Sequence, residues 1–175
     1  MLNLFINQSW LTPPIKKMAF FLCLIFITSA VYAESADLLI GEIQLEDLQQ
    51  PAFASWFEGN YKGYSPDPDV MEQLRPLMDD VSIMLFMGTW CHDSQREVPR
   101  LVKLLQIAEF EQSNLQIIGL STTKTTPSGV EQLYKIERTP TIVFFHNGVE
   151  IGRIVEKVKK TLEQDILTIV KERAI

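Results

Sequence analysis

The sequence has little cysteine, little histidine and no excess of positive charge, and each shortage excludes a class of protein. Two of its 175 residues are cysteines, Cys23 and Cys91, which is too few for a scaffold held together by disulfides. The two histidines and Cys91 show no ligand spacing, so we expect neither a metal nor another cofactor. The net charge is −6, with 16 Lys and Arg against 22 Asp and Glu, so the chain offers no basic surface for nucleic acid.

What remains is an ordinary globular composition. Hydrophobic residues make up 46% of the chain and charged residues 22%, values that argue against a disordered or fibrous protein. A chain of this length with several apolar runs buries one core without metal or disulfide staples. We therefore expect one compact domain.

The first 33 residues have the pattern of a secretory signal peptide. Lys16 and Lys17 precede an uncharged apolar stretch, 18–33, which ends in small residues. This pattern predicts cleavage after Ala33. The alternative is a retained membrane anchor, but the stretch is shorter than the ~20 residues that a membrane-spanning helix needs. We expect a secreted, periplasmic protein with no stable membrane insertion after cleavage.

Residues 34–80 have mixed patterns and form an N-terminal extension of the domain. We expect a strand within 38–43, a helix over 45–57, a turn-rich loop over 60–69 and a short helix over 70–78. Four aromatic residues of this segment either line a binding groove or anchor the core and loops, and the sequence leaves both readings open: Trp56, Phe57, Tyr61 and Tyr64.

From Val81 to the C-terminus the patterns are clearer. The apolar run Val81–Met87 predicts a buried strand, and a helix should run from Cys91 to about Phe110, kinked by the proline within it, Pro99. A second buried strand is expected over 115–120, a polar loop over 121–128 and a short helix over 129–135.

The C-terminal part predicts a hairpin and a last helix. Asn147-Gly148 supplies the two residues that a tight turn needs at positive φ, between strands at 141–146 and 149–155. The last helix should begin at Thr161, with Gln164 as its capping-box partner. This order of elements predicts an α/β fold with a central mixed sheet and helices on both faces.

Cys91 is the strongest candidate for chemistry. It follows Trp90 at the point where a buried strand passes into a helix, where free backbone N–H groups of Asp93 and Ser94 and the helix dipole favour a thiolate. The Ser94 hydroxyl can add a hydrogen bond to the sulfur. A protonated His92 would help the thiolate, whereas the Asp93 carboxylate would oppose it. The alternative is an inert, buried cysteine.

The segment from Val81 to Ile175 resembles the thioredoxin superfamily. The resemblance rests on Trp90-Cys91-His92-Asp93-Ser94, on Pro99 eight residues after the cysteine, on Arg138-Thr139-Pro140-Thr141, and on the hairpin and final helix. It implies that Cys91 is the attacking cysteine, that Pro140 is cis, and that Trp90, His92, Thr139 and Pro140 contribute to substrate binding, with the Thr139 backbone pairing with a bound peptide.

Two departures from the superfamily pattern change the expected chemistry. Ser94 stands where the resolving cysteine would be, so this chain cannot run an internal dithiol–disulfide cycle. Leu85 stands where thioredoxins usually carry a buried acid that assists proton transfer.

The expected function is therefore thiol-disulfide exchange of monothiol type, with Cys91 as nucleophile and Ser94 as its stabiliser. The expected partners are protein or small-molecule thiols and disulfides, with a second thiol supplied by a substrate, a small thiol or a separate reductase. A redox-inactive binding module or chaperone of the same fold is the alternative. A thiol peroxidase is a weaker one, because no further residues near Cys91 support it.

Overall fold

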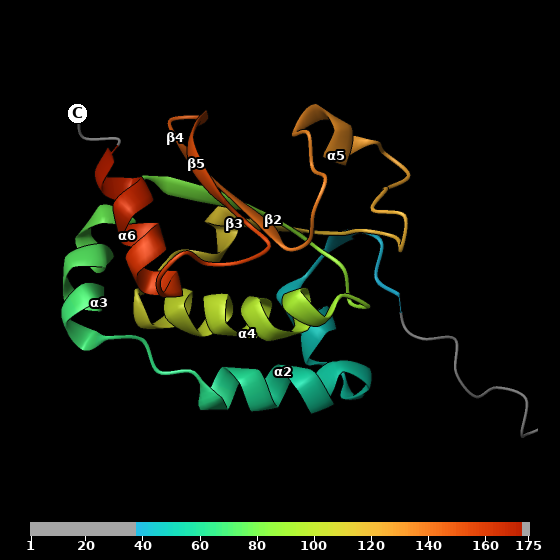
Figure 1. The fold of residues 1–175 in the computed structure, drawn as a ribbon, viewed down its shortest axis with the longest axis horizontal. Coiled ribbons are helices and arrows are strands. Elements are labelled where there is room, and N and C mark those ends of the chain that lie inside the picture. Colours follow the sequence, from blue (N-terminus) through green and yellow to red (C-terminus); the bar gives the residue numbers. More distant parts are fainter. Residues whose placement is uncertain (1–37, 173–175) are drawn as a thin grey trace, which may run out of the picture. The chain divides into compact units, whose positions relative to one another are not determined.

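The centre of the protein is a five-stranded mixed sheet (Figure 1). The computed structural model describes residues 38–172. Its strands lie in the order β1-β3-β2-β4-β5, and only β2 and β3 run parallel. Their bounds are β1 Gly41–Ile43, β2 Val81–Met87, β3 Leu115–Gly119, β4 Thr141–His146 and β5 Val149–Val155.

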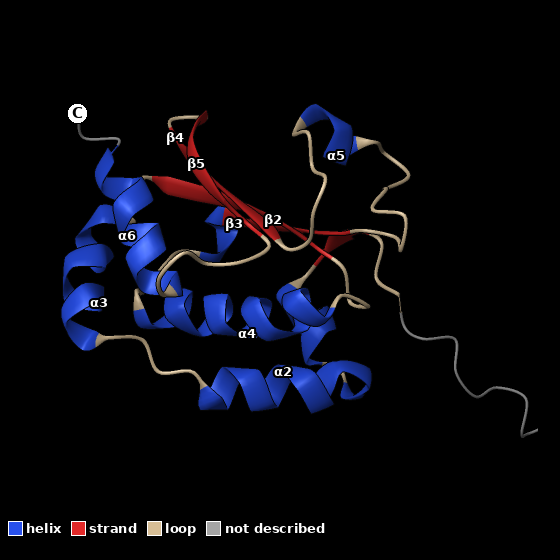
Figure 2. Cartoon of the chain, in the orientation of Figure 1, coloured by secondary structure: helices blue, strands red, loops and turns tan. Residues whose placement is uncertain are grey.

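The helices cover the two faces of this sheet unequally (Figure 2). Their bounds are α2 Pro51–Gly63, α3 Pro68–Leu74, α4 His92–Ile107, α5 Val130–Leu133 and α6 Leu162–Glu172. Three 3-10 turns complete the described elements, at Leu45–Gln49, Arg75–Leu77 and Gln112–Asn114. The expected α/β fold with a mixed central sheet is confirmed.

The alternation of side chains along β2 divides the core into two parts. Ile83, Leu85 and Met87 point to the face covered by α4 and α6 and belong to the larger apolar cluster. Phe86 points to the other face, where it joins a smaller cluster with Ile136 beside α5. Because all of these side chains are nearly or fully buried, β2 behaves as the fully covered central strand that its continuous apolar run predicts.

Residues 38–80 pack on the larger cluster as an outer layer. In Figure 1, α2 runs along α4, and α3 lies beside α6. Phe57 of α2, together with Met71 and Leu74 of α3, is buried within the cluster. The segment is thus built into the same core as the strands.

The boundaries in this segment differ from the sequence prediction. Residues 60–63, expected to be loop, form the last turn of α2, and the loop begins at Tyr64. The expected helix over 45–57 is two elements, a 3-10 turn and α2, because Pro51 occupies the first turn of the second one. Asn60 is a residue type that favours turns, and its contacts with α4, described below, hold it within α2.

The predictions for the C-terminal half are confirmed more closely. Asn147 and Gly148 have φ of 52° and 76°, and they connect β4 and β5 as an antiparallel hairpin. Thr161 precedes α6, and its hydroxyl accepts a hydrogen bond from the backbone N–H of Gln164 at 3.4 Å. A bulge at Phe144/Phe145 interrupts the hairpin register.

The short strand β1 depends on a glycine. Gly41 pairs with Gly119 across the antiparallel ladder of β1 and β3. A Cβ atom on Gly119 would lie 2.2 Å from the backbone oxygen of Leu39, so no other residue fits there without moving the chain that leads into β1.

The predicted signal peptide, 1–33, lies outside the described residues. Among residues 38–172, no helix is long and apolar enough to span a membrane.

Candidate functional site

Cys91 is the N-cap residue of α4, at the carboxyl end of β2. Its backbone N–H donates to the Gly88 carbonyl at 2.9 Å, and its own carbonyl accepts from the Gln95 N–H at 2.9 Å. The thiol is free, and the residue is half-buried. The sequence prediction of a cysteine at a strand-to-helix junction is confirmed by this placement.

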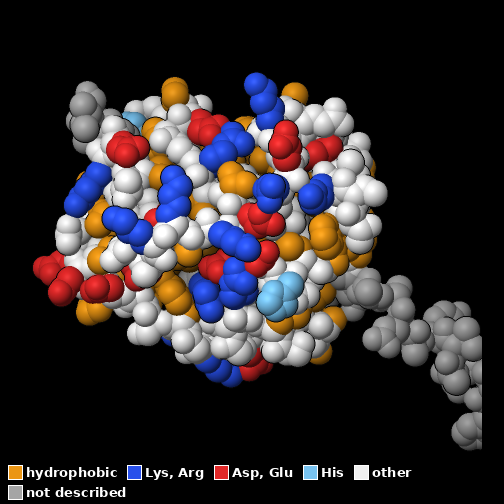
Figure 3. Space-filling view, in the orientation of Figure 1, with side chains coloured by type: hydrophobic (Ala, Val, Ile, Leu, Met, Phe, Trp, Pro, Cys, Tyr) orange, Lys and Arg blue, Asp and Glu red, His pale blue; other side chains and the backbone are white. Residues whose placement is uncertain are grey.

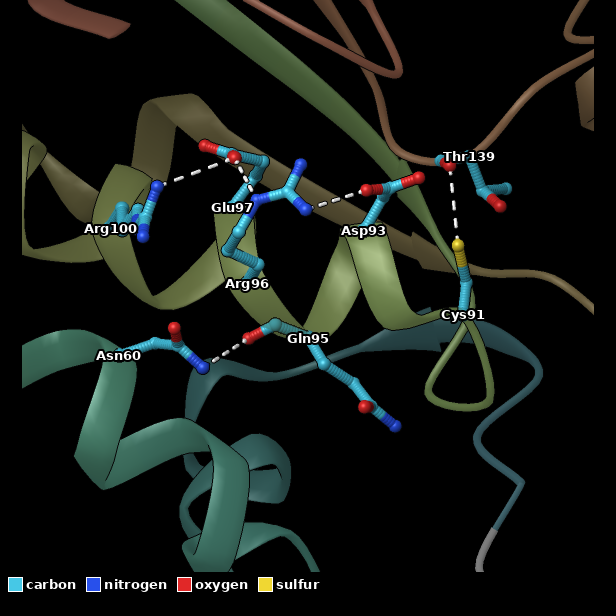
Figure 4. Close-up of polar contacts among 8 residues, drawn as sticks. All are labelled: Asn60, Cys91, Asp93, Gln95, Arg96, Glu97, Arg100 and Thr139. Carbon is cyan, nitrogen blue, oxygen red and sulfur yellow. Dashed lines mark hydrogen bonds and ion pairs between the residues drawn. The ribbon is translucent and has the colours of Figure 1, made fainter.

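The sulfur contacts the bend before β4. Cys91 Sγ donates a hydrogen bond to the Thr139 backbone oxygen at 3.3 Å, as Figure 4 shows. The peptide bond between Thr139 and Pro140 is cis, as the resemblance implies. Two residues that are 48 positions apart are thus brought together. The Cys91 thiol thus lies against a backbone carbonyl of the bend before β4.

The expected hydrogen bonds from the first turn of α4 to the sulfur are not formed. Within the described structure, Cys91 has no side-chain capping bond to the helix N–H groups. The physical reason is orientation: the side chain points across to Thr139 rather than back over its own helix. The N-cap position therefore gives the sulfur no direct capping bond.

Ser94 faces inward and fastens the turn that carries Cys91. Its side chain is fully buried, and its Oγ accepts a hydrogen bond from the Gly88 backbone N–H at 3.2 Å. Gly88 directly follows β2, so this bond ties the end of the strand to the first turn of α4. The Ser94 hydroxyl is thus bound to the backbone of Gly88.

Trp90 connects the same turn to the end of β3. Its Nε1 donates to the Leu120 backbone oxygen at 3.0 Å, and 37% of the residue is exposed. A Cβ atom on Gly88 would lie 2.6 Å from the indole ring, so glycine at that position leaves space for the tryptophan. Trp90 therefore joins the ends of β2 and β3 beside Cys91 and keeps one surface open.

Charges in the first two turns of α4 form a connected chain. His92 is exposed. Asp93, the acid expected to oppose a thiolate, pairs with Arg96 at 2.8 Å. Arg96 Nε also lies 2.6 Å from Glu97, a buried carboxylate that contacts Arg100 at 3.5 Å (Figure 4). The hydrogen bond to Glu97 raises the pKa of Arg96 above its ordinary value, and Asp93 adds to this effect.

The bend at Thr139 and Pro140 is buried and braced on both sides. Thr141 Oγ1 donates to the Arg138 backbone oxygen at 2.7 Å. Arg138 itself pairs with Glu156 at 2.6 Å, and the Glu156 N–H donates to the Pro140 oxygen at 2.7 Å. These bonds connect the bend to the chain beyond β5. They fix the carbonyl that Cys91 contacts.

Two residues of the site were missed by sequence reasoning. Gln95 Nε2 donates to the Thr89 backbone oxygen at 2.8 Å, and Asn60 Nδ2 of α2 donates to the Gln95 backbone oxygen at 3.2 Å. Neither residue carries a reactive group, and Asn60 was predicted to be in a loop. The sequence does contain one signal for a residue such as Asn60. Pro99 has no N–H, so the Gln95 carbonyl lacks its donor within the helix and needs a donor from elsewhere.

A cavity of about 590 Å³ lies apart from this site, between α2 and the C-terminal half of α4. Its lining includes Phe57, Tyr61, Leu105 and Phe110, and none of the predicted site residues. Two of the four aromatic residues considered above as a groove, Phe57 and Tyr61, therefore line a cavity. Phe57 is at the same time part of the core.

The described residues contain no group of three or more His, Cys, Asp or Glu side chains arranged to hold a metal ion. Charged side chains of both signs are spread over the face seen in Figure 3.

Comparisons with known proteins bear on the fold. No family model matches the sequence, and no curated protein matches it. Among solved structures, an HIV epitope-scaffold protein is 16% identical with a TM-score of 0.55, covering 83% of this chain and 98% of that chain. A protein of unknown function from Pseudomonas aeruginosa is 16% identical with a TM-score of 0.48, covering 69% and 81%.

Thioredoxins are also among the matched structures. Mitochondrial thioredoxin 3 from Saccharomyces cerevisiae is 18% identical with a TM-score of 0.38, covering 65% of this chain and 98% of that chain. At these identities a likeness concerns the fold alone. The strand order, the helix capped by Cys91 and the hairpin after Pro140 give this chain a thioredoxin-like fold.

Proposed function

We propose that this protein is a thiol-disulfide oxidoreductase of monothiol type that acts through Cys91. The observation that carries the proposal is the contact between Cys91 Sγ and the Thr139 oxygen, because it joins an accessible thiol to a backbone edge. A peptide lying along that edge would present its own disulfide to the sulfur. Trp90, His92, Thr139 and Pro140 are the proposed substrate contacts.

The proposed reaction has two steps. The Cys91 thiolate attacks one sulfur of a substrate disulfide, so that a new S–S bond forms, the substrate bond breaks and a substrate thiolate leaves. A second thiolate then attacks the mixed disulfide and releases Cys91 as thiolate, leaving a new disulfide between substrate and attacking thiol. If the second thiol belongs to the substrate, the result is isomerisation. If it belongs to a small thiol or a reductase, the part of the substrate bound to Cys91 leaves as a disulfide with that thiol.

The second thiol has to come from outside this site, because Ser94 cannot supply one. Its hydroxyl is buried and bonded to the Gly88 N–H, which supports a positioning role for it. We place the reaction outside the cytosol, in the periplasm, because the first 33 residues have the pattern of a signal peptide.

The experiment follows the mixed disulfide by intact mass. Purified protein is mixed with a peptide disulfide, and we expect one peptide to be added at Cys91, to persist, and to leave when glutathione is added. Cys91→Ser is the matched control and should gain no mass. A wild-type protein that is readily alkylated by iodoacetamide but never forms the mixed disulfide would contradict the proposal.

A second variant tests the monothiol assignment. Ser94→Cys supplies a thiol one turn from Cys91, so we expect a mixed disulfide that resolves without glutathione and an internal disulfide that replaces it. The measured quantity is the lifetime of the peptide adduct. An unchanged lifetime would mean that position 94 does not reach the sulfur.

A redox-inactive binding module is the second candidate, and the cavity between α2 and α4 is the observation that favours it. Its volume of about 590 Å³ is within the range of small-molecule sites. Under this reading Cys91→Ser would retain full activity in cells. If the protein acts by thiol-disulfide exchange, Cys91→Ser would lose its activity in cells.

A further inference from the structure

We infer that Gln95 and Asn60 are positioning residues, which hold the Cys91 sulfur against the Thr139 carbonyl. The inference rests on the proposed function and adds to it. It assigns a role in the reaction to α2, an element outside the segment that carries the thioredoxin resemblance.

Gln95 fastens the turn before Cys91 from within α4. Its side-chain amide donates to the Thr89 oxygen at 2.8 Å, while its backbone N–H donates to the Cys91 oxygen at 2.9 Å. One residue thus holds the chain on both sides of Trp90. The Gly88 N–H also donates to Ser94 Oγ, so two consecutive side chains, those of Ser94 and Gln95, tie the turn to α4.

Asn60 holds Gln95 from the neighbouring helix. Proline has no N–H, so Pro99 cannot donate to the carbonyl four residues earlier, which is that of Gln95. Asn60 Nδ2 donates to this oxygen at 3.2 Å and to the Trp56 oxygen of its own helix at 2.9 Å. The amide of Asn60 therefore spans the two helices, as the close-up in Figure 4 shows for its contact with Gln95.

These contacts form one continuous route from α2 to the sulfur. It runs from Asn60 to the Gln95 backbone, through the Gln95 side chain to Thr89, and along the turn to Cys91. Every contact in the route is a hydrogen bond between uncharged groups, so the route acts by fixing position and not by changing charge. Loosening it should let the sulfur move away from Thr139.

The first measurement is amide hydrogen exchange in the folded protein. Gln95→Met keeps the length of the side chain but cannot donate to Thr89, so we expect the Cys91 amide to exchange about fivefold faster, as for the loss of one hydrogen bond. Amides within the β2 ladder should not change. Gln106→Met is the matched control, because Gln106 lies on the same helix and contacts Tyr61 of α2 far from Cys91.

The second measurement separates positioning from general stability. Exchange with a peptide disulfide needs both the sulfur and the Thr139 edge, whereas alkylation by iodoacetamide needs the sulfur alone. We expect Gln95→Met to lower the ratio of the two rates and Gln106→Met to leave it unchanged. An equal ratio in both variants would overturn the inference.

A double-mutant cycle tests the part played by Asn60. Asn60→Leu removes the donor to the Gln95 oxygen, and Pro99→Ala returns a helical N–H to the same oxygen. We expect Asn60→Leu to speed exchange of the Cys91 amide in the wild-type background and to do so much less beside Pro99→Ala. Equal effects in both backgrounds would exclude coupling through this carbonyl.

The outcomes distinguish this inference from the proposed function. If the wild-type protein forms no mixed disulfide, the proposed function fails, and the amide exchange still decides whether Gln95 and Asn60 hold the turn. If the mixed disulfide forms but all variants match the wild type in both measurements, the positioning role fails alone.

Discussion

Glu97 and Glu163 are both buried carboxylates on helices that cover the same face of the sheet, but they are satisfied in different ways. Glu97 on α4 contacts two arginines of its own helix, Arg96 at 2.6 Å and Arg100 at 3.5 Å. Glu163 on α6 accepts from the Tyr64 hydroxyl at 2.5 Å and from the Asp67 backbone N–H at 3.2 Å. Glu97 has charged partners close to it in the sequence, whereas the Glu163 carboxylate has uncharged donors that are far from it in the sequence.

The two carboxylates differ in how far along the chain their contacts reach. The Glu97 pairs join residues within one turn, so they exist wherever α4 is helical. The Glu163 bonds join residues 96 and 99 positions apart, and they fasten the loop between α2 and α3 to α6. Loss of the Glu163 bonds should therefore loosen the outer layer formed by residues 38–80, whereas loss of the Glu97 pairs should have a smaller effect that stays within α4.

The largest effect is expected for Glu163→Ala. The Tyr64 hydroxyl and the Asp67 N–H would lose a charged acceptor, and a hydrogen bond to a charged group contributes about 1.5–3 kcal/mol. We expect the free energy of unfolding in urea to fall by about 3 kcal/mol. Glu172→Ala, at the exposed end of the same helix, is the control and should change little. An equal loss of stability in Glu163→Ala and Glu172→Ala would mean that the long-range bonds of Glu163 do not stabilise the fold.

The pH dependence of stability should report the same carboxylate. Burial acts to raise the pKa of Glu163, but hydrogen bonds from Tyr64, its own N–H and Asp67 outweigh it and lower the pKa below the ordinary value. A lowered pKa in the folded state gives stability that is present above the ordinary carboxyl pKa and lost as the pH falls through the folded value. Urea unfolding between pH 7 and pH 3 should show a smaller loss in Glu163→Gln than in the wild type.

Tyr64→Phe should have the next largest effect. Burial, followed by the hydrogen bond to Glu163, raises the pKa of the Tyr64 hydroxyl, so the folded state keeps it neutral. The phenylalanine retains the ring but removes one donor, and we expect a loss of about 1.5 kcal/mol in urea unfolding. The wild type should also lose stability above about pH 10, where an unfolded tyrosine ionises, and the variant should lose less.

Glu97→Gln should cost less than either change. Arg96 keeps its contact with Asp93 at 2.8 Å, and Arg100 loses its charged partner but is partly exposed, so water can solvate its charge. We expect a loss of about 1 kcal/mol in urea unfolding. A loss as large as that of Glu163→Ala would show that local charged pairs hold this fold as strongly as long-range bonds.

Lys62→Ala should have the smallest effect. Lys62 and Glu58 form an exposed pair at 2.5 Å on α2, and such pairs contribute little because water screens them. The hydrogen bond with Lys62 lowers the pKa of Glu58, but this exposed group gives no measurable stability. The transition midpoint in urea should stay within experimental error of the wild type.

The sequence predicts the part of the fold that local patterns encode. The strand Val81–Met87 is confirmed at both ends because a buried strand needs a continuous apolar run, and the hairpin is confirmed because Asn147-Gly148 specifies its turn. The prediction fails for 60–63, where Asn60 and Gly63 have the composition of a turn. Long-range donation by Asn60 to α4 overrides that preference.

The candidate site was predictable in its residues but not in its bonds. A cysteine after an apolar strand indicates a helix N-terminus, and the resemblance supplied Thr139 and Pro140 as its neighbours. The direction of the Cys91 side chain, the inward turn of Ser94 and the bond from Gln95 to Thr89 depend on how the turn is packed. No periodicity encodes such contacts, since they form between groups that meet only after the chain has folded.

The close fit at Gly119 has a consequence for solubility. The strand β1 is three residues long, and within residues 38–172 it is the strand that pairs with the outer edge of β3. A side chain at position 119 would push away the segment that leads into β1, and the apolar strand β3 would then be left as an open edge. Open edges of this kind pair with other chains, so a single methyl group there would favour aggregation.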